Sequence, residues 1–254
     1  MRTLERQAGS PLIVRGPQGI RLTAAGRILL VQADAIAARL ASAEDELAAL
    51  VDLRGGTVRV AAFPSACATL VPPALEQLAS AHPGLSLELT EAEPPEAEAL
   101  VEAGDVDAAL VFRYGETAAV DPPHRRRVSL GVEPVSAVLP QGHRLAQGGS
   151  LRLEQLSVDT WIAGCARCRA HLLAVCDRAG FVPTIRHSTD DYVVVQSLLA
   201  KGLGVALLPG LALRSYQDPH VRVVPLEEAG HRTISVVYHA EAERTPRCVR
   251  SSPP

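Results

Sequence analysis

Apolar residues recur in steps of four and three between residues 23 and 53, and this spacing constrains the fold of the chain more than any other feature. Residues three and four apart share one face of a helix, so the spacing predicts one long amphipathic helix with an apolar seam. The seam consists of Leu29, Ala33, Ile36, Leu40, Ala43, Leu47 and Leu50. Thr23 can cap the N-terminus of this helix with its hydroxyl, and Gly55-Gly56 can end it.

Either of two partners can cover the seam. A second copy of the chain would make it a coiled coil, whereas packing on the chain's own body would make it an ordinary surface helix. The predicted length exceeds that of most helices in globular proteins, which favours self-association as a homodimer or homotetramer. The dimerisation residues would then be Leu29, Ile36, Leu40, Leu47 and Leu50.

Positive charge is concentrated at the N-terminal end. Residues 1 to 27 hold five arginines against one glutamate, although the net charge of the whole chain is −3. This asymmetry predicts contacts with phosphate at that end only. Residues 12–15 and 20–22 read as a small hairpin, which is either a wing that reaches DNA or a solvated hairpin with incidental arginines. The candidate DNA-binding residues are Arg2, Arg6, Arg15 and Arg21.

Beyond residue 56 the pattern changes to strands that alternate with helices, which predicts an α/β fold with ligand sites beyond the carboxyl ends of the strands. The first series has strands at residues 57–62, 85–90 and 106–112, and helices at 66–81 and 96–103. The second series has strands at residues 135–139, 161–163, 185–187 and 205–208, and helices at 166–179 and 190–201. Two series predict two lobes, and a strand at 231–239 could cross back to the first lobe.

The N-terminal run resembles part of the DNA-binding head of LysR-type transcriptional regulators. Residues 4 to 30 match the end of the recognition helix, the wing and the start of the linker helix in that family. The matching features are Leu4-Glu5, Gly9, Pro11-Leu12, Arg15, Gly19, Leu22-Thr23 and Gly26. The body, with KGLGVALLPGLAL at residues 201–213 as its best marker, is similar to the family's effector domain, a two-lobed periplasmic-binding-protein-like fold of type 2. The resemblance covers about residues 4 to 240.

This resemblance implies a division of the chain into five parts. They are residues 1–22, the remnant of a winged helix-turn-helix domain; 23–54, the linker and dimerisation helix; 57–134 with 233–243, the first lobe; 135–232, the second lobe; and 244–254, a disordered tail. The family carries further helices before this point, so we expect the chain to be truncated within its DNA-reading head.

The resemblance also implies a small-molecule effector held in the cleft between the lobes. Its candidate contacts are Ser65, Ala66, Glu93, Gly164, Thr189 and Asp190. For Ser65 and for the Thr189-Asp190 pair, the alternative role is to cap a helix. Many relatives have a neutral hydroxyl residue where Glu93 stands, so a carboxylate facing the cleft there disfavours an effector that carries a carboxylate.

Two cysteines and a histidine follow one another at helical spacing in Cys165-Ala-Arg-Cys168-Arg-Ala-His171, with Cys176 beyond. A thiol at a helix N-terminus beside arginines has a lowered pKa, which permits redox chemistry at Cys165, Cys168 and Cys176. Peroxide-sensing relatives carry a reactive cysteine in this region. Two other roles are open: the thiols are simply buried small side chains, or Cys165, Cys168 and His171 share a metal ion. We expect no metal, because no second cluster completes a four-ligand set.

Enzyme functions are not expected. The chain has no Gly-x-Ser-x-Gly elbow, phosphate-binding loop or dinucleotide-binding glycine pattern, so no catalytic residue and no cofactor is assigned. No apolar run approaches the ~20 residues of a membrane span, and the N-terminus does not read as a secretion leader. These features predict a cytoplasmic protein without a membrane partner.

The sequence therefore favours a LysR-family DNA-binding transcriptional regulator controlled by a small molecule. Three alternatives stay open: a sensor without a DNA-reading head that titrates full-length regulators, a thiol-redox sensor, and a solute-binding protein of the transport kind. The wing disfavours the last of these.

Overall fold

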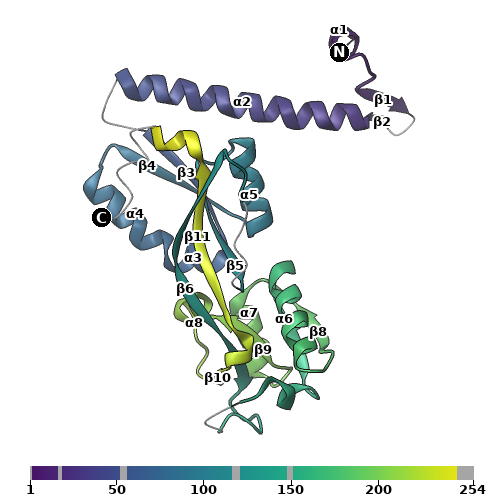
Figure 1. The fold of residues 1–254 in the computed structure, drawn as a ribbon, viewed down its shortest axis with the longest axis vertical. Helices are drawn as coiled ribbons and strands as arrows, with labels where there is room; N and C mark the ends of the chain where they lie inside the picture. The colour runs from purple at the N-terminus through teal and green to yellow at the C-terminus, as the bar shows by residue number, and fades with distance from the viewer. Residues whose placement is uncertain (1, 17–18, 52–55, 116–120, 148–150, 245–254) are drawn as a thin grey trace.

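The computed structural model describes residues 2–16, 19–51, 56–115, 121–147 and 151–244, and shows a long helix set across one end of an elongated α/β body (Figure 1). The body has two lobes. Lobe I contains strands β3 to β5 and helices α3 to α5, and lobe II contains strands β7 to β10 and helices α6 to α8. Two long strands, β6 and β11, run through both lobes.

The N-terminal hairpin is present as predicted. Helix α1 (Arg2–Ala8) precedes strands β1 (Ile13–Gly16) and β2 (Gly19–Leu22), which pair antiparallel. The hairpin is joined to the long helix by a hydrogen bond from Thr23 N to Leu12 O of 3.0 Å. A Cβ atom at position 26 would lie 2.1 Å from Leu12 O, so only glycine permits this close approach.

The predicted long helix is α2 (Ala24–Val51), and Thr23 caps it as expected, since its Oγ1 accepts from Gly26 N at 2.9 Å. Leu29 is half-buried, whereas Ile36 and Leu40 are 67% and 61% exposed in the single chain. The side chains of Leu47 and Leu50, and the whole of Gly55, lie outside the described residues. Dimerisation through this helix stays a prediction.

Lobe I contains three parallel strands, as the alternating pattern predicts, within a mixed sheet. Strand β3 (Gly56–Ala62) lies between β4 (Leu85–Glu91) and β5 (Ala108–Tyr114) and is parallel to both. Helix α5 (Pro94–Ala103) connects β4 to β5. The core of this lobe includes Ala61, Ala97, Val101, Val111 and Val237, all of them buried.

The helix predicted for residues 66–81 is wrong as a single element. The structure has α3 (Pro64–Thr69) and α4 (Val71–Ala81), which meet at Leu70. Pro72 and Pro73 explain the break, because a proline has no backbone N–H and its ring clashes with the carbonyl four residues earlier.

Lobe II repeats the alternation. Its elements are the 3-10 helix η1 (Leu153–Leu156), β7 (Thr160–Ala163), α6 (Ala166–Arg178), β8 (Thr184–Ser188), α7 (Tyr192–Ala200), β9 (Ala206–Pro209), α8 (Gly210–Ser215), β10 (Val221–Pro225) and η2 (Glu227–Ala229). Strands β7 and β8 are parallel, and β9 and β10 pair antiparallel with β6. Trp161 and Cys176 are among the side chains buried in its core.

Strand β11 (His231–His239) returns to lobe I and pairs with β5 and β6, which confirms the predicted crossing, and η3 (Ala240–Arg244) follows it. Strand β6 (Arg125–Pro140) starts ten residues before the predicted strand at 135. The charged residues in this part of β6 interrupt the apolar pattern from which a strand is predicted. Arg125 and Arg127 are half-buried, and ion pairs with Glu98 and Asp121 compensate their charges there. Of the tail predicted at residues 244–254, Arg244 is the last residue of η3, and residues 245–254 lie outside the described residues.

Candidate functional site between the lobes

Side chains from both lobes and from the two shared strands meet at one contact, which we call the interlobe site. Lobe I contributes Ser65 and Glu93, near the N-termini of α3 and α5, and Tyr114 at the end of β5. Lobe II contributes the N-terminal ends of α6 and α7. These N-termini and the ends of parallel strands are where an α/β fold holds ligands.

Arg232 on β11 is at the centre of the interlobe site and is fully buried. Its Nε lies 2.5 Å from Glu133 Oε1 on β6, and its Nη2 donates to Ser65 Oγ at 2.8 Å. Burial lowers the pKa of Arg232, whereas the negative charge of Glu133 raises it. The net pKa is raised, so the guanidinium remains charged. The guanidinium also packs over the Phe63 and Phe112 rings, at 4.9 and 4.3 Å from their centroids.

Glu133 extends this connection into lobe II, because its Oε2 accepts a hydrogen bond from Leu211 N at the start of α8. The buried pair therefore joins α3 of lobe I to α8 of lobe II through the two shared strands. Arg232 Nη1 is buried and has no hydrogen-bond partner among the described residues.

Ser65 does not cap its helix, so the capping alternative is wrong. The N-cap residue is Phe63, and Pro64 occupies the first turn, where the missing N–H of proline costs nothing. The hydroxyl of Ser65 is buried and accepts a hydrogen bond from Arg232 instead. Ser65 also forms a side-chain hydrogen bond with Tyr192 of α7. Ala66 is fully buried in a cluster with Phe63 and Cys165.

Glu93 occupies the N-cap position of α5 but makes no capping hydrogen bond with its side chain. Burial raises its pKa above the ordinary 4.5, and Asp190 raises it too, whereas Cys165, Arg232 and Arg167 lower it. These partners place the carboxyl group at the interlobe site. Its Oε2 is buried without a hydrogen-bond partner within the described structure.

Helix α6 brings two thiols against lobe I. Cys165 is the N-cap residue, with its Sγ accepting from Cys168 N at 3.3 Å, and the two sulfur atoms are 2.8 Å apart. Tyr114 of lobe I donates its hydroxyl to Cys168 Sγ at 3.4 Å, and its ring stacks on His171 at 3.8 Å between centroids. Arg167 Nη1 donates across the contact to Phe112 O at 3.2 Å.

The prediction of a lowered pKa for the thiol at the helix N-terminus is wrong for Cys165, the N-cap residue, because its hydrogen bond to Cys168 and its burial raise its pKa. The lowered pKa is that of Cys168, and its causes are hydrogen bonds. The Cys165 thiol, as a hydrogen-bond donor, and the Tyr114 hydroxyl lower the pKa of Cys168, while burial opposes them. Cys176 is different: it is buried in the core of lobe II, and burial raises its pKa to about 12. His171 donates a hydrogen bond from Nε2 to Ala229 O at 2.8 Å. Among the described residues no group of three or more candidate ligands could hold a metal ion.

Gly164 and Asp190 border the same site, because Gly164 directly precedes Cys165 and the charge of Asp190 acts on Glu93. A Cβ atom on Gly164 would lie 3.3 Å from the Cys168 Cβ. The cap of α7 is Asp191, which accepts from Val193 N at 2.8 Å. The alternative role for Thr189 and Asp190 as caps is therefore wrong, because the helix starts later, at Tyr192. Thr189 Oγ1 instead accepts from Asp191 N at 3.3 Å.

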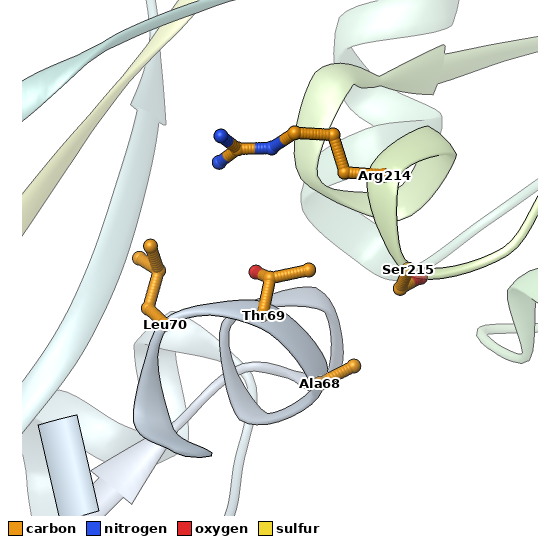
Figure 2. Close-up of a pocket in the computed structure, with 5 residues that line it drawn as sticks. All are labelled: Ala68, Thr69, Leu70, Arg214 and Ser215. Carbon is orange, nitrogen blue, oxygen red and sulfur yellow. The ribbon is translucent and has the colours of Figure 1, made fainter. Parts of the chain in front are cut away.

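An open hollow of about 370 Å³ lies at a second junction between the lobes (Figure 2). It is lined by Ala68, Thr69, Leu70, Arg214 and Ser215, and the Arg214 side chain extends from α8 toward the end of α3. None of the residues predicted to bind an effector lines it, so the interlobe site remains the candidate.

Among the predicted DNA-binding residues, Arg6 on α1 and Arg21 on β2 are exposed. The side chains of Arg2 and Arg15 lie outside the described residues. No helix in the described ranges has both the length and the apolar character needed to cross a membrane.

Comparison with known proteins decides the family. A family profile described as the LysR substrate binding domain matches residues 52–250. The HTH-type transcriptional regulator ShiR of Corynebacterium glutamicum (strain R) is 30% identical over 213 residues, which are 82% of this chain and 70% of that protein. The chain belongs to the family of LysR-type transcriptional regulators. The predicted resemblance is thereby confirmed.

Solved structures of LysR regulators share the fold. Full-length CbnR in complex with its target DNA superposes with a TM-score of 0.67 at 20% identity, over 95% of this chain and 82% of CbnR. The effector-binding domain of BenM with its effector benzoate superposes with a TM-score of 0.63 at 21% identity, over 72% of this chain and 83% of that domain. The periplasmic-binding-protein-like fold expected for this LysR regulator is confirmed.

Four residues of the interlobe site were not predicted from the sequence as effector contacts: Glu133, Arg232, Tyr114 and Tyr192. A signal was available for the first two, because each is a charged residue in a largely apolar strand, where only a pairing partner makes its burial tolerable. Nothing local indicates that the two pair, since they lie 99 residues apart.

Proposed function

We propose that this LysR regulator controls transcription by coupling the binding of a small polar effector at the interlobe site to the arrangement of two or four copies on DNA. The single observation that carries the proposal is the interlobe site itself, where buried polar groups of both lobes converge on Arg232. Family membership supports the DNA-binding part. The proposal keeps DNA, an effector and further copies of the chain as partners.

The unpartnered polar atoms suggest which effector groups the site would accept. Arg232 Nη1 can donate to an oxygen acceptor, and Glu93 Oε2 can accept from a donor or share a proton. A buried polar atom without a partner costs free energy, so an effector that satisfies both atoms gains affinity there. We therefore propose a small molecule with an acceptor group at one end and a donor group at the other. BenM binds benzoate. Benzoate carries an acceptor group but no donor group, so as a probe it tests the Arg232 end of the site alone.

Closure of the lobes is the step that the effector would control. Ser65 and Arg232 are fully buried and Cys165 nearly so, so a ligand reaches them only when the lobes separate. An effector that binds better to one lobe arrangement shifts the population toward it. Because α2 would hold copies together at the other end of lobe I, a change in lobe arrangement would alter the geometry of the DNA-binding ends.

The N-terminal elements would supply phosphate contacts. Arg6 lies on α1 and Arg21 on β2, and both are exposed, as phosphate-binding arginines must be. The alternative is a sensor that associates with full-length regulators without reading DNA itself. The two functions differ in whether the chain prefers one DNA sequence over another.

One titration separates these functions. Fluorescence anisotropy would follow the full chain binding to labelled DNA from upstream of its own gene at ~150 mM salt, with unrelated DNA of equal length as competitor. A panel of small polar molecules that includes benzoate would then be added. We expect preference for the upstream DNA, a shift in affinity with one or more compounds, and loss of that shift in Ser65→Ala.

Two variants make the result specific. Arg21→Ala should weaken binding to all DNA and reduce the slope of log affinity against log salt by about 1, whereas Arg222→Ala, an exposed arginine of β10, should do neither. Equal affinity for upstream and unrelated DNA would contradict the regulator. A compound response that survives Ser65→Ala would contradict the interlobe site.

A further inference from the structure

We propose that Cys165 and Cys168 form a redox-active dithiol that closes reversibly to a disulfide, and that this closure changes the contact between the two lobes. The chemistry needs neither DNA nor an effector, so the inference goes beyond the proposed function. It also selects one pair from the three cysteines that the sequence suggests for redox chemistry.

The backbone places the two thiols together. Cys165 follows β7 and caps α6, which leads to β8, and β7 and β8 are parallel. A Cys-x-x-Cys sequence at the start of the helix of such a unit is typical of thiol-disulfide chemistry. The N-cap residue and the third residue of the first turn lie on the same side of the helix, and the two sulfur atoms are 2.8 Å apart. A disulfide bond of ~2.05 Å therefore needs less than about 1 Å of movement.

The glycine before the pair helps it to approach. A Cβ atom at position 164 would meet the Cys168 Cβ at 3.3 Å and its Sγ at 3.7 Å. A larger residue there would push Cys168 away from Cys165. The other two cysteines of the described chain are placed differently, because Cys67 donates to Ala62 O at 3.2 Å and Cys176 is buried in the core of lobe II.

The surroundings favour Cys168 as the nucleophile. Hydrogen bonds from the Cys165 thiol and the Tyr114 hydroxyl stabilise its thiolate and lower its pKa, although burial opposes them. Cys168 is also partly exposed, whereas Cys165 is buried. By contrast, burial raises the pKa of Cys67 to about 11 and that of Cys176 to about 12, which leaves those thiols protonated and unreactive.

A hydroperoxide is the oxidant that we propose. The Cys168 thiolate attacks one peroxide oxygen, the O–O bond breaks, and the departing oxygen takes a proton and leaves as water or an alcohol. Cys168 is now a sulfenic acid. The Cys165 sulfur then attacks Cys168 Sγ, and the hydroxyl leaves as water with the Cys165 proton. Two electrons pass from the thiols to the peroxide, and a small dithiol such as dithiothreitol reverses the change by thiol-disulfide exchange.

The pair lies where such a change would reach lobe I. Cys165 packs in a cluster with Ala62, Phe63 and Ala66, and Cys168 Sγ accepts a hydrogen bond from the hydroxyl of Tyr114. A disulfide removes the thiolate that this hydroxyl stabilises and moves both sulfur atoms. We therefore expect oxidation to loosen or shift the contacts of α3 and β5 with α6.

The first experiment maps the disulfide on the full chain. Reduced protein is treated with hydrogen peroxide, free thiols are alkylated, and mass spectrometry locates the linkage. We expect the loss of two hydrogen atoms within the peptide that holds Cys165 and Cys168, reversed by dithiothreitol. In Cys165→Ser the reaction should stop at a Cys168 sulfenic acid that dimedone traps, whereas Cys168→Ser should give neither product. Cys67→Ser and Cys176→Ser should behave as the wild type.

The second experiment measures hydrogen exchange in the reduced and oxidised chains. We expect altered exchange at residues 62–69 and 108–114 of lobe I in the wild type and in Cys176→Ser, but not in Cys168→Ser. Absence of the Cys165–Cys168 linkage, or linkage through another cysteine, would overturn the redox pair. Exchange changes confined to α6 would overturn the effect on the lobes. Both measurements are independent of DNA binding, so they fail separately from the proposed function.

Discussion

Glu93 shows how one side chain can report on the interlobe site. Its carboxyl group is held where charge is unfavourable, because burial and Asp190 raise its pKa more than Arg232, Arg167 and Cys165 lower it. The folded chain therefore binds a proton at pH values where the unfolded chain has released it. By linkage, the free energy of unfolding falls as the pH rises from the ordinary pKa of 4.5 through the folded pKa.

Glu93→Gln should remove this loss. The amide has nearly the same size and never ionises, so we expect the variant to be more stable than the wild type at pH 7 and equally stable below pH ~4. Urea unfolding at a series of pH values would measure the difference, with Glu88→Gln, an exposed carboxylate on β4, as the control. A difference that does not change with pH would contradict the raised pKa of the buried Glu93 carboxyl.

At the scale of elements, α2 leaves large apolar side chains of its seam exposed in the single chain. A hollow of about 670 Å³ separates it in part from α5 and is lined by Ile36, Arg39 and Glu98, among others. Leu40 lies one turn further along the seam and is 61% exposed. Exposed apolar side chains at coiled-coil spacing are expected where another helix packs.

Leu40→Glu should therefore break the association. A charge in an apolar helix contact costs free energy because it loses water, so we expect the dissociation constant of the dimer to rise at least about tenfold. Light scattering coupled to size-exclusion chromatography would show the mass of the assembly at several concentrations. Val31→Glu, at a position that is 60% exposed and faces away from the seam of the same helix, should keep the wild-type mass. A monomeric wild type would contradict the coiled coil.

For the molecule as a whole, the buried pair of Arg232 and Glu133 connects the lobes through the strands that they share. Glu133 accepts from Leu211 N of lobe II, and Arg232 donates to Ser65 of lobe I. Deleting one partner of a buried pair leaves the other charge without compensation.

We expect Glu133→Ala to lower the free energy of unfolding of the chain by about 3–5 kcal/mol. An exposed pair gives the matched comparison: Glu154→Ala, which removes the partner of Arg152, should cost no more than ~1 kcal/mol. Denaturant unfolding would measure both. A loss at Glu133 as small as that at Glu154 would show that the pair does not hold the lobes together.

The sequence by itself determined the elements whose causes are local. The seam of α2, the cap by Thr23 and the hairpin before it follow from residues within a few positions of one another, and so does the alternation that predicts two lobes. The break at Leu70 also has a local cause, Pro72 and Pro73. The motif at Cys165 and Cys168 was visible because the pair lies within one helical turn.

Only the tertiary structure decided which side chains contact one another at the interlobe site. Ser65 is a partner of Arg232 and not a helix cap, although 167 residues separate the two. No local pattern encodes that contact, because it depends on β6 and β11 passing through both lobes. The same packing buries Glu93 and brings Tyr114 to Cys168. Periodicity specifies which face of an element is apolar, but burial and pairing across the chain set the charge, the reactivity and the partners of each side chain.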